Sequence, residues 1–429
     1  MNDAAAAVRP RRRRWWWLLG MAVLLLLLIA IGLRMVLRPE FATRIILEQA
    51  GQQLGLEITA SGPAEYDIRG TPRLVLRGVR ARRPGAEREL LTAERLYLSV
   101  PWETLKTRGA VLDVERIELD APVLDLTELQ AWQRTRPPSA SQRLPTLTRG
   151  VRVVRGKLLG EGWSVDAIRI DAPYFAPLRP LTAKVAGRYL ARTLQLSFDL
   201  DLAMSKPAND AALGLAGHVE PIAIDWRLPM RLRLSTPIHW SDDGLRLSPA
   251  TLGANVRYIG TGGKPLPFVI GAYGAARLSK DGLDWSPLAL ALRGEGAVPD
   301  LDLHGRLHAG TQLALALEGG LQQWPHAWPR LPRPLDQSRS PLSFSLAYDG
   351  ALDLSDVVAL DMRRDATRFD GRLHIRDVMA WRDAMDTDSP LPPIDGHVST
   401  PRLDIAGARL EGVEIEFEEP TVPDARPRP

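Results

Sequence analysis

The chain has 429 residues and a formal net charge of +4, a length that suits one large or two ordinary domains. Residues 1–44 contain eight arginines and two acids, so the remaining 385 residues sum to −2. A near-neutral body of this kind lacks the basic surface of nucleic-acid-binding proteins. The chain has no cysteine, which excludes disulfides, zinc–thiolate sites and thiol catalysis.

The N-terminus predicts a membrane anchor. Nineteen uncharged residues run from Trp15 to Leu33, and as a helix they would be about 28 Å long, close to the thickness of the hydrocarbon core of a bilayer. We assign a basic cytoplasmic tail to residues 1–14 and a transmembrane anchor to residues 15–37, with the rest of the chain outside. The boundary residues are Arg11, Arg12, Arg13, Arg14, Trp15, Trp16 and Trp17. A cleaved signal peptide is the alternative, which the long apolar run and the lack of a small-residue cleavage site disfavour.

Beyond the anchor the hydrophobic period changes. Apolar residues over 41–54 have helical spacing and predict a short helix at the membrane exit. The runs at 72–80, 91–100, 111–119 and 122–126 instead alternate apolar and polar residues. Alternation with a period of two predicts β-strands that have one dry face and one wet face.

The order of these segments resembles the N-terminal region of the AsmA family of bacterial envelope proteins. After the anchor and the short helix come a P-x-L-x-L-x-x-V strand from Pro72, an A-x-x-L-x-L-x-V strand from Ala93 and an I-x-L-x-x-P-x-L-x-L strand from Ile117. A looser copy spans 403–415. The resemblance implies a mainly β protein, with a single transmembrane helix and an elongated antiparallel sheet curled into a groove. It also implies an inner-membrane protein with its C-terminal part in the periplasm, which supports phospholipid transport and outer-membrane biogenesis.

The middle of the chain repeats itself. Residues 243–252 align with residues 281–290 at an offset of 38, and further Asp-Gly pairs occur at 349–350, 370–371 and 395–396. Asp-Gly between alternating runs is typical of tight hairpins in which both central residues have positive φ. We therefore predict an antiparallel meander with a few short helices. The predicted regions beyond the anchor are an AsmA-like β region at 38–136, a hairpin region at 137–320, a C-terminal β region at 321–419 and a disordered tail at 420–429.

Three segments share an apolar-x-x-Trp pattern, ending at Trp132, Trp324 and Trp381, and each is followed by a proline-rich linker. We predict that these segments interrupt the strands, that the short helices of the body lie there, and that each tryptophan plugs the sheet.

The dry face defines the candidate site. The candidate groove-lining residues are Leu96, Leu98, Leu232, Leu234, Leu301, Leu303, Leu313, Leu315, Phe344 and Leu346. Such a face must pack on another sheet or curl over a hydrophobic guest. Composition alone favours a closed sandwich filled by its own side chains. The AsmA resemblance favours an open groove that holds acyl chains, about 120 Å long for roughly 25 strands.

No enzyme signature is found in the sequence: G-x-S-x-G, P-loop and H-E-x-x-H motifs are absent. His304 and His308 would lie too far apart along a strand to share a metal, and Asp199 and Asp201 alternate with leucine as on a solvated face. We predict a protein that is not an enzyme and has no cofactor or metal.

Its predicted partners are the inner-membrane bilayer, phospholipid acyl chains and an envelope protein, with no nucleic acid. The alternative function is an envelope assembly factor with a closed β core, similar to the type II secretion N component or to outer-membrane protein assembly factors.

Overall fold

The computed structural model describes residues 47–48, 51–52, 54–62, 64–67, 70–106, 113–135, 146–241, 243–260, 264–321, 323–328, 330–383, 393–405 and 408–417. The predicted basic tail, the anchor and the C-terminal tail lie outside these residues. Of the predicted exit helix, the described residues 47–48, 51–52 and 54 are helical. In the described part of the chain, no helix is long and apolar enough to cross a membrane.

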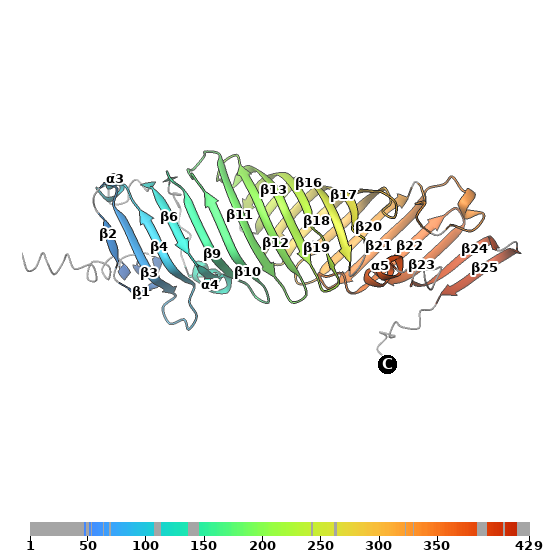
Figure 1. The fold of residues 1–429 in the computed structure, drawn as a ribbon, viewed down its shortest axis with the longest axis horizontal. Coiled ribbons are helices and arrows are strands. Elements are labelled where there is room, and N and C mark those ends of the chain that lie inside the picture. The colour runs from blue at the N-terminus through green and yellow to red at the C-terminus, as the bar shows by residue number, and fades with distance from the viewer. Residues whose placement is uncertain are drawn as a thin grey trace, which may run out of the picture.

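A single antiparallel sheet of 23 strands dominates the structure, and it confirms the prediction of a mainly β fold (Figure 1). From β9 to β25 the chain forms a meander, in which successive strands pair in antiparallel order. The strands are β1 (Glu57–Ala60), β2 (Glu65–Asp67), β3 (Arg73–Arg82), β4 (Leu91–Ser99), β5 (Asp113–Val114), β6 (Arg116–Asp120), β7 (Val123–Asp125), β8 (Thr146–Leu147), β9 (Val151–Leu159), β10 (Ser164–Ala172), β11 (Leu181–Leu190), β12 (Gln195–Met204), β13 (Asp210–Ile222), β14 (Trp226–Arg227), β15 (Met230–Ser241), β16 (Gly244–Gly260), β17 (Leu266–Ser279), β18 (Gly282–Gly294), β19 (Leu301–Ala309), β20 (Leu313–Leu321), β21 (Leu342–Gly350), β22 (Val357–Arg364), β23 (Thr367–His374), β24 (Asp395–Ile405) and β25 (Ala408–Phe417).

The sheet is shorter than its number of strands suggests. β1 and β2 both pair with β3, β6 and β7 both lie between β4 and β9, and β14 and β15 both lie between β13 and β16. The 23 strands therefore form about 20 rows, and the sheet measures roughly 90 Å across its strands. The expected 120 Å was too long because it gave each strand a row of its own. Only β9 runs parallel to its neighbours on one side, β6 and β7.

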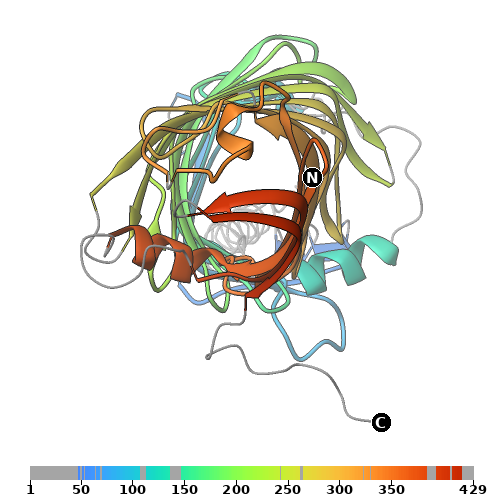
Figure 2. The same ribbon diagram turned by 90° about the vertical axis from the view of Figure 1, so that its right-hand side faces the viewer.

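The described strands do not divide into the two facing sheets that a sandwich needs: apart from the two-stranded β5–β8 ladder, they belong to one sheet. This sheet is rolled about its long axis (Figure 2). Proline contributes to the bending, because it cannot donate a ladder hydrogen bond. Register shifts occur at matching heights in β15, β16, β17 and β18. In three of these strands the shift spans an X-Pro step, at 236–237, 248–249 and 286–287. Such bulges bend a strand and increase its twist.

The two copies of the 38-residue repeat both form tight hairpins, as predicted, but with a different position for glycine. Gly244 and Gly282 each begin the second strand of their hairpin and carry the positive φ, 121° and 132°. They are therefore not central residues of the turn.

The prediction of tight turns at the other Asp-Gly pairs was wrong. Gly350 ends β21 before a loop at 351–356, residues 370–371 lie inside β23, and residues 395–396 begin β24.

The described helices are short: α3 (Trp102–Lys106), α4 (Leu126–Arg134), α5 (Ile375–Asp383) and the 3-10 turn η1 (Leu335–Gln337). Trp132 lies in α4 and Trp381 in α5, which confirms that these two interruptions are helical. The Trp132 indole N–H donates to the carbonyl of Leu54 at 2.8 Å. Trp324 instead lies in the loop after β20, with its ring edge-on to Trp328 and ring centroids 4.9 Å apart. Helix α3 was not predicted.

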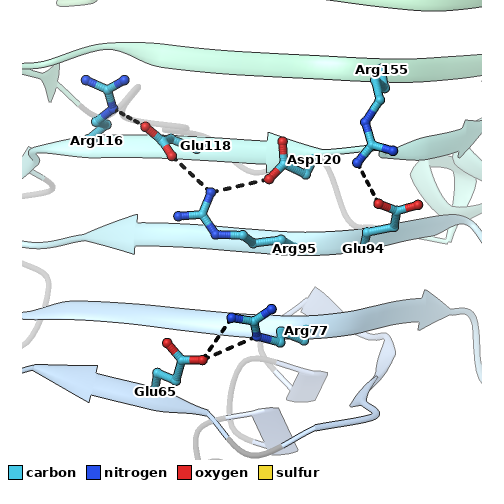
Figure 3. Close-up of polar contacts among 8 residues, drawn as sticks. All are labelled: Glu65, Arg77, Glu94, Arg95, Arg116, Glu118, Asp120 and Arg155. Atoms are coloured by element: carbon cyan, nitrogen blue, oxygen red, sulfur yellow. Dashed lines mark hydrogen bonds and ion pairs between the residues drawn. The ribbon is translucent and has the colours of Figure 1, made fainter.

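The wet face of the N-terminal strands carries ion pairs between neighbouring strands. Arg95 on β4 bridges two carboxylates of β6, those of Glu118 at 3.2 Å and Asp120 at 3.3 Å. Arg77 on β3 donates to Glu65 on β2 at 3.0 Å. Figure 3 shows these contacts together with two further pairs, Arg155 with Glu94 and Arg116 with Glu118. Charges on this face are thus matched within the protein, which fits a solvated surface.

Candidate functional site: an apolar groove

One face of the sheet carries an unbroken line of apolar residues that are register partners across 15 strands, from β3 to β21. This apolar line consists of Leu76, Leu96, Leu119, Val153, Ile170, Val185, Leu200, Gly217, Leu232, Ala254, Ile270, Leu292, Leu301, Leu321 and Leu342. It contains no polar or charged side chain. The adjacent line on the opposite face is mostly polar, and over β12–β18 it consists of Asp199, His218, Arg231, Asn255, Val269 and Arg293.

The ten predicted lining residues all lie on the face of the apolar line. Leu96, Leu232 and Leu301 are members of it, and the other seven stand an even number of positions from a member on the same strand. The face predicted from alternation is therefore one continuous surface, because the antiparallel register keeps the parity from strand to strand.

The N-terminal end of this face is covered. Leu47, from the helical segment that follows the predicted anchor, is buried against Leu76, Val79 and Ala93. Leu96 packs against the same cluster. The helical segment around Leu47 thus closes the first rows of the sheet.

The face is open over the next rows. Six members of the apolar line on β9–β15 are half-buried and belong to neither of the two buried clusters of the described residues. This open stretch consists of Val153, Ile170, Val185, Leu200, Gly217 and Leu232. On β12 the contrast between the faces is direct: Leu200 is half-buried, while its neighbours Asp199 and Asp201 are exposed. The apolar face is therefore sheltered by the curvature of the sheet and not covered by a second layer.

The C-terminal half of the face is filled by its own side chains. Its buried cluster spans β15–β20 and consists of Ile238, Leu247, Ala250, Ala272, Ala276, Trp285, Leu288, Leu303 and Leu317. Leu303 is only 9% exposed, whereas Leu234, Leu301, Leu315 and Phe344 are partly buried against the cluster. Alternation could not separate this filled half from the open stretch, because both have the same sequence pattern.

The polar residues singled out in the sequence lie on the wet face, and three of them have a charged neighbour there. The His308 ring contacts Asp284 at 2.6 Å, the His304 ring lies 3.7 Å from Glu318, and Asp201 lies 3.4 Å from Lys184. Among the described residues, no group of three His, Cys, Asp or Glu side chains is placed to hold a metal ion.

One carboxylate pair on the wet face is strained electrostatically. Asp370 on β23 stands opposite Asp361 on β22. A hydrogen bond shared with Asp361 raises the pKa of Asp370, and desolvation and the Asp361 charge act in the same direction, while His397 and Arg363 lower it. Both carboxylates are exposed enough for water to screen them, so the effect on stability is small.

We expect the substitution Asp370→Asn to raise the free energy of unfolding at neutral pH by a few tenths of a kcal/mol. A carboxyl group whose pKa is higher in the folded state favours folding while it is protonated, and this contribution is lost as the pH rises through the folded pKa. The gain from the substitution should therefore disappear below about pH 4, where the unfolded-state carboxyl is also protonated. Urea denaturation at several pH values measures it. If Asp361→Asn adds its full single-mutant effect on top of Asp370→Asn, the two groups are not coupled.

No family model, curated protein or solved structure matches the chain.

Proposed function

We propose that the protein is an AsmA-like, inner-membrane-anchored periplasmic protein whose groove holds phospholipid acyl chains and supports their transport toward the outer membrane. The observation that carries the proposal is the open stretch of the apolar line, six rows of half-buried apolar residues without a polar interruption.

The free energy of hydration favours a guest on this stretch. Covering apolar surface stabilises by roughly 25 cal/mol per Å², and monomeric soluble proteins seldom expose contiguous apolar patches beyond a few hundred Å². Six rows extend about 24 Å, more than the ~15 Å that one leaflet of the hydrocarbon core occupies. The stretch is therefore long enough for an acyl chain laid across the strands.

The sequence also supports a position at the inner membrane. The predicted anchor at residues 15–37 precedes the sheet directly, and the arginines before it favour a cytoplasmic N-terminus. The helical segment around Leu47, which packs on the first rows, would then bring the groove next to the bilayer surface.

The proposal predicts selective lipid contact from one face of one strand. A photo-crosslinking amino acid at Leu200, in full-length protein in cell membranes, is expected to give phospholipid adducts detected by mass spectrometry. The matched control is Ala203, three positions further on β12, which is exposed on the wet face. Absence of adducts at Leu200, or equal yields at the two positions, would contradict the proposal.

The alternative, an envelope assembly factor, is favoured by one specific observation. β25 pairs with β24 on one side only among the described strands, so its other edge can accept a strand from another protein. The exposed charges of Arg409, Glu411 and Glu414 protect this edge against unspecific pairing. Protein adducts from a crosslinker at the exposed Leu410, together with no lipid adducts at Leu200, would favour this function.

A further inference from the structure

The two long margins of the sheet meet at one place. Turns alternate between a first margin, which includes the residues 223–229 between β13 and β15, and a second margin, which includes loop 351–356 and helix α5. The indole N–H of Trp226 on the first margin donates to the carbonyl of Asp353 on the second, at 3.0 Å. Arg376 of α5 forms an ion pair with Asp225 at 3.6 Å. We call these two contacts the clasp.

The clasp closes the groove from the side. Trp226 lies in the row of β15, and Asp353 follows β21, which is six rows further along the sheet. Margins that are so far apart along the sheet touch because the sheet is rolled about its long axis, as the end-on view shows (Figure 2). Four of the strands between the two margins, β15–β18, carry the aligned register shifts.

The loop that presents Asp353 is held in shape by its own hydrogen bonds. The buried Tyr348 hydroxyl donates to the carbonyl of Ala351 at 2.6 Å, and the Asp356 carboxylate accepts from the Ala351 N–H at 2.7 Å. The N–H of Ser355 donates to the Asp353 carboxylate at 3.1 Å. The loop on the second margin is therefore already ordered where it meets Trp226. Formation of the clasp then costs little additional conformational entropy in this loop.

Behind the clasp lies a pocket of about 410 Å³, within the size range of sites that enclose one small ligand or one chain. Its apolar walls come from both margins and from the dry face, and they include Leu228, Phe268, Leu292, Leu354, Ile375 and Met379. The indole N–H of Trp328 donates to the carbonyl of Ala297 at 2.8 Å and fixes a further wall. The charged residues in the lining, Asp225, Arg376 and Asp353, all belong to the clasp.

The pocket continues the groove and also ends it. Leu292 is a member of the apolar line, three strands beyond Leu232 at the end of the open stretch. Further along, Leu321 and Leu342 are buried and leave no room for a guest. Between the open stretch and the pocket, the apolar line passes the small side chain of Ala254, which is 6% exposed, and the half-buried Ile270. A chain that extends from the open stretch along this line therefore passes over Ala254 before it meets the pocket.

We propose that this pocket binds the methyl-terminal part of one unbranched acyl chain, and that the clasp is its lateral wall. The inference rests on the proposed function and adds a defined site to it. The head group stays outside, because the one basic residue in the lining, Arg376, is paired with Asp225 and Asp377. Asp353 also lies in the lining, and its carboxylate repels a phosphate. The polar end of the lipid then lies at β13–β15, about 15–20 Å from Leu292, and the chain end is held at the clasp.

Position-resolved photolabelling tests the site. The purified full-length protein is loaded from phosphatidylethanolamine vesicles containing one of two phosphatidylglycerol probes. One probe carries a diazirine at the end of an acyl chain, and the other carries it next to the glycerol ester. We expect the chain-end probe to label peptides containing Leu292 and Met379, and the ester-proximal probe to label β13–β15, which lie about 15–20 Å from Leu292. Labelling of β9–β15 by both probes, without labelling of the Leu292 and Met379 peptides, would overturn the site and leave the groove function intact, whereas labelling of neither region would overturn both.

Variants separate binding from folding. The substitution Ala223→Trp fills the pocket and is expected to reduce chain-end labelling about tenfold, the effect of leaving two methylenes in water. Ala223→Met fills the pocket with a smaller and more flexible side chain, in case the tryptophan disturbs the fold. The matched control is Ala203→Trp, which adds the same tryptophan on the wet face, away from the pocket. The double change Trp226→Phe and Arg376→Gln removes both clasp contacts and should release bound probe to acceptor vesicles about tenfold faster. Unchanged labelling in both filled variants would contradict the proposal.

Discussion

A glutamate in place of Leu303 is expected to unfold the C-terminal half of the sheet, whereas a glutamate in place of Leu200 is expected to leave the protein folded and to abolish lipid binding. Leu303 is 9% exposed within the buried cluster of β15–β20, so its replacement buries an unpaired charge, at a cost of several kcal/mol. Leu200 is half-buried in the open stretch, where a carboxylate can remain hydrated and makes the groove polar. Far-UV circular dichroism during urea denaturation measures the first effect, and the phospholipid content of the purified protein measures the second.

The control for this pair is Arg306→Glu, which puts the same new side chain on the exposed face of the strand that carries Leu303. It should change stability by less than about 1 kcal/mol. If Leu200→Glu destabilises the protein as much as Leu303→Glu does, the open stretch is a closed core. The lipid proposal would then fail.

The second large effect is expected from Gly150→Ala. Gly150 precedes β9 and has a φ of 71°, a conformation that costs an L-residue about 1–2 kcal/mol. A Cβ at this position would also lie 1.7 Å from the carbonyl oxygen of Ala172, so the backbone of β10 would have to move. The carbonyl of Gly150 accepts from the N–H of Ile117 at 3.1 Å, and this bond helps to join β9 to β6. We expect a loss of more than about 4 kcal/mol in the free energy of unfolding, measured by urea denaturation.

Gly162 provides a matched control, since its φ is 77° but no atom lies within 4 Å of where its Cβ would be. Gly162→Ala should therefore lower the free energy of unfolding only by the cost of placing an alanine at positive φ, about 1–2 kcal/mol. Similar losses for the two variants would show that the packing between Gly150 and Ala172 is not tight.

The dry face could be read from the sequence residue by residue, because the side-chain period of a strand is two and antiparallel pairing preserves it. Leu96, Leu232 and Leu301 were assigned to one face from alternation alone, and the register joins them. Whether the face was open or filled could not be read, since Leu200 and Leu303 occupy the same pattern. Their difference depends on curvature.

Aligned bulges in neighbouring strands contribute to the curvature, and three of these bulges contain prolines whose positions become adjacent only after pairing. The repeat showed Pro249 and Pro287, but the matching Pro237 on β15 lies outside it. The clasp was equally hidden, because Trp226 and Asp353 are 127 positions apart and neither belongs to a recognisable motif. Local signals also failed for the later Asp-Gly pairs, where strand pairing decided the outcome against the turn preference.

The 38-residue repeat gives the sheet a unit of growth. Each copy of the repeat begins a strand after a tight hairpin on the second margin, at Gly244 and at Gly282, and two strands separate one copy from the next. Duplication of such a unit adds about 10 Å of sheet and returns the chain to the margin where it began. Every residue downstream then keeps its face and direction, whereas the gain of a single strand would reverse the direction of all that follows. Evolution can therefore lengthen or shorten this groove in whole hairpins, while its lining and both ends stay unchanged.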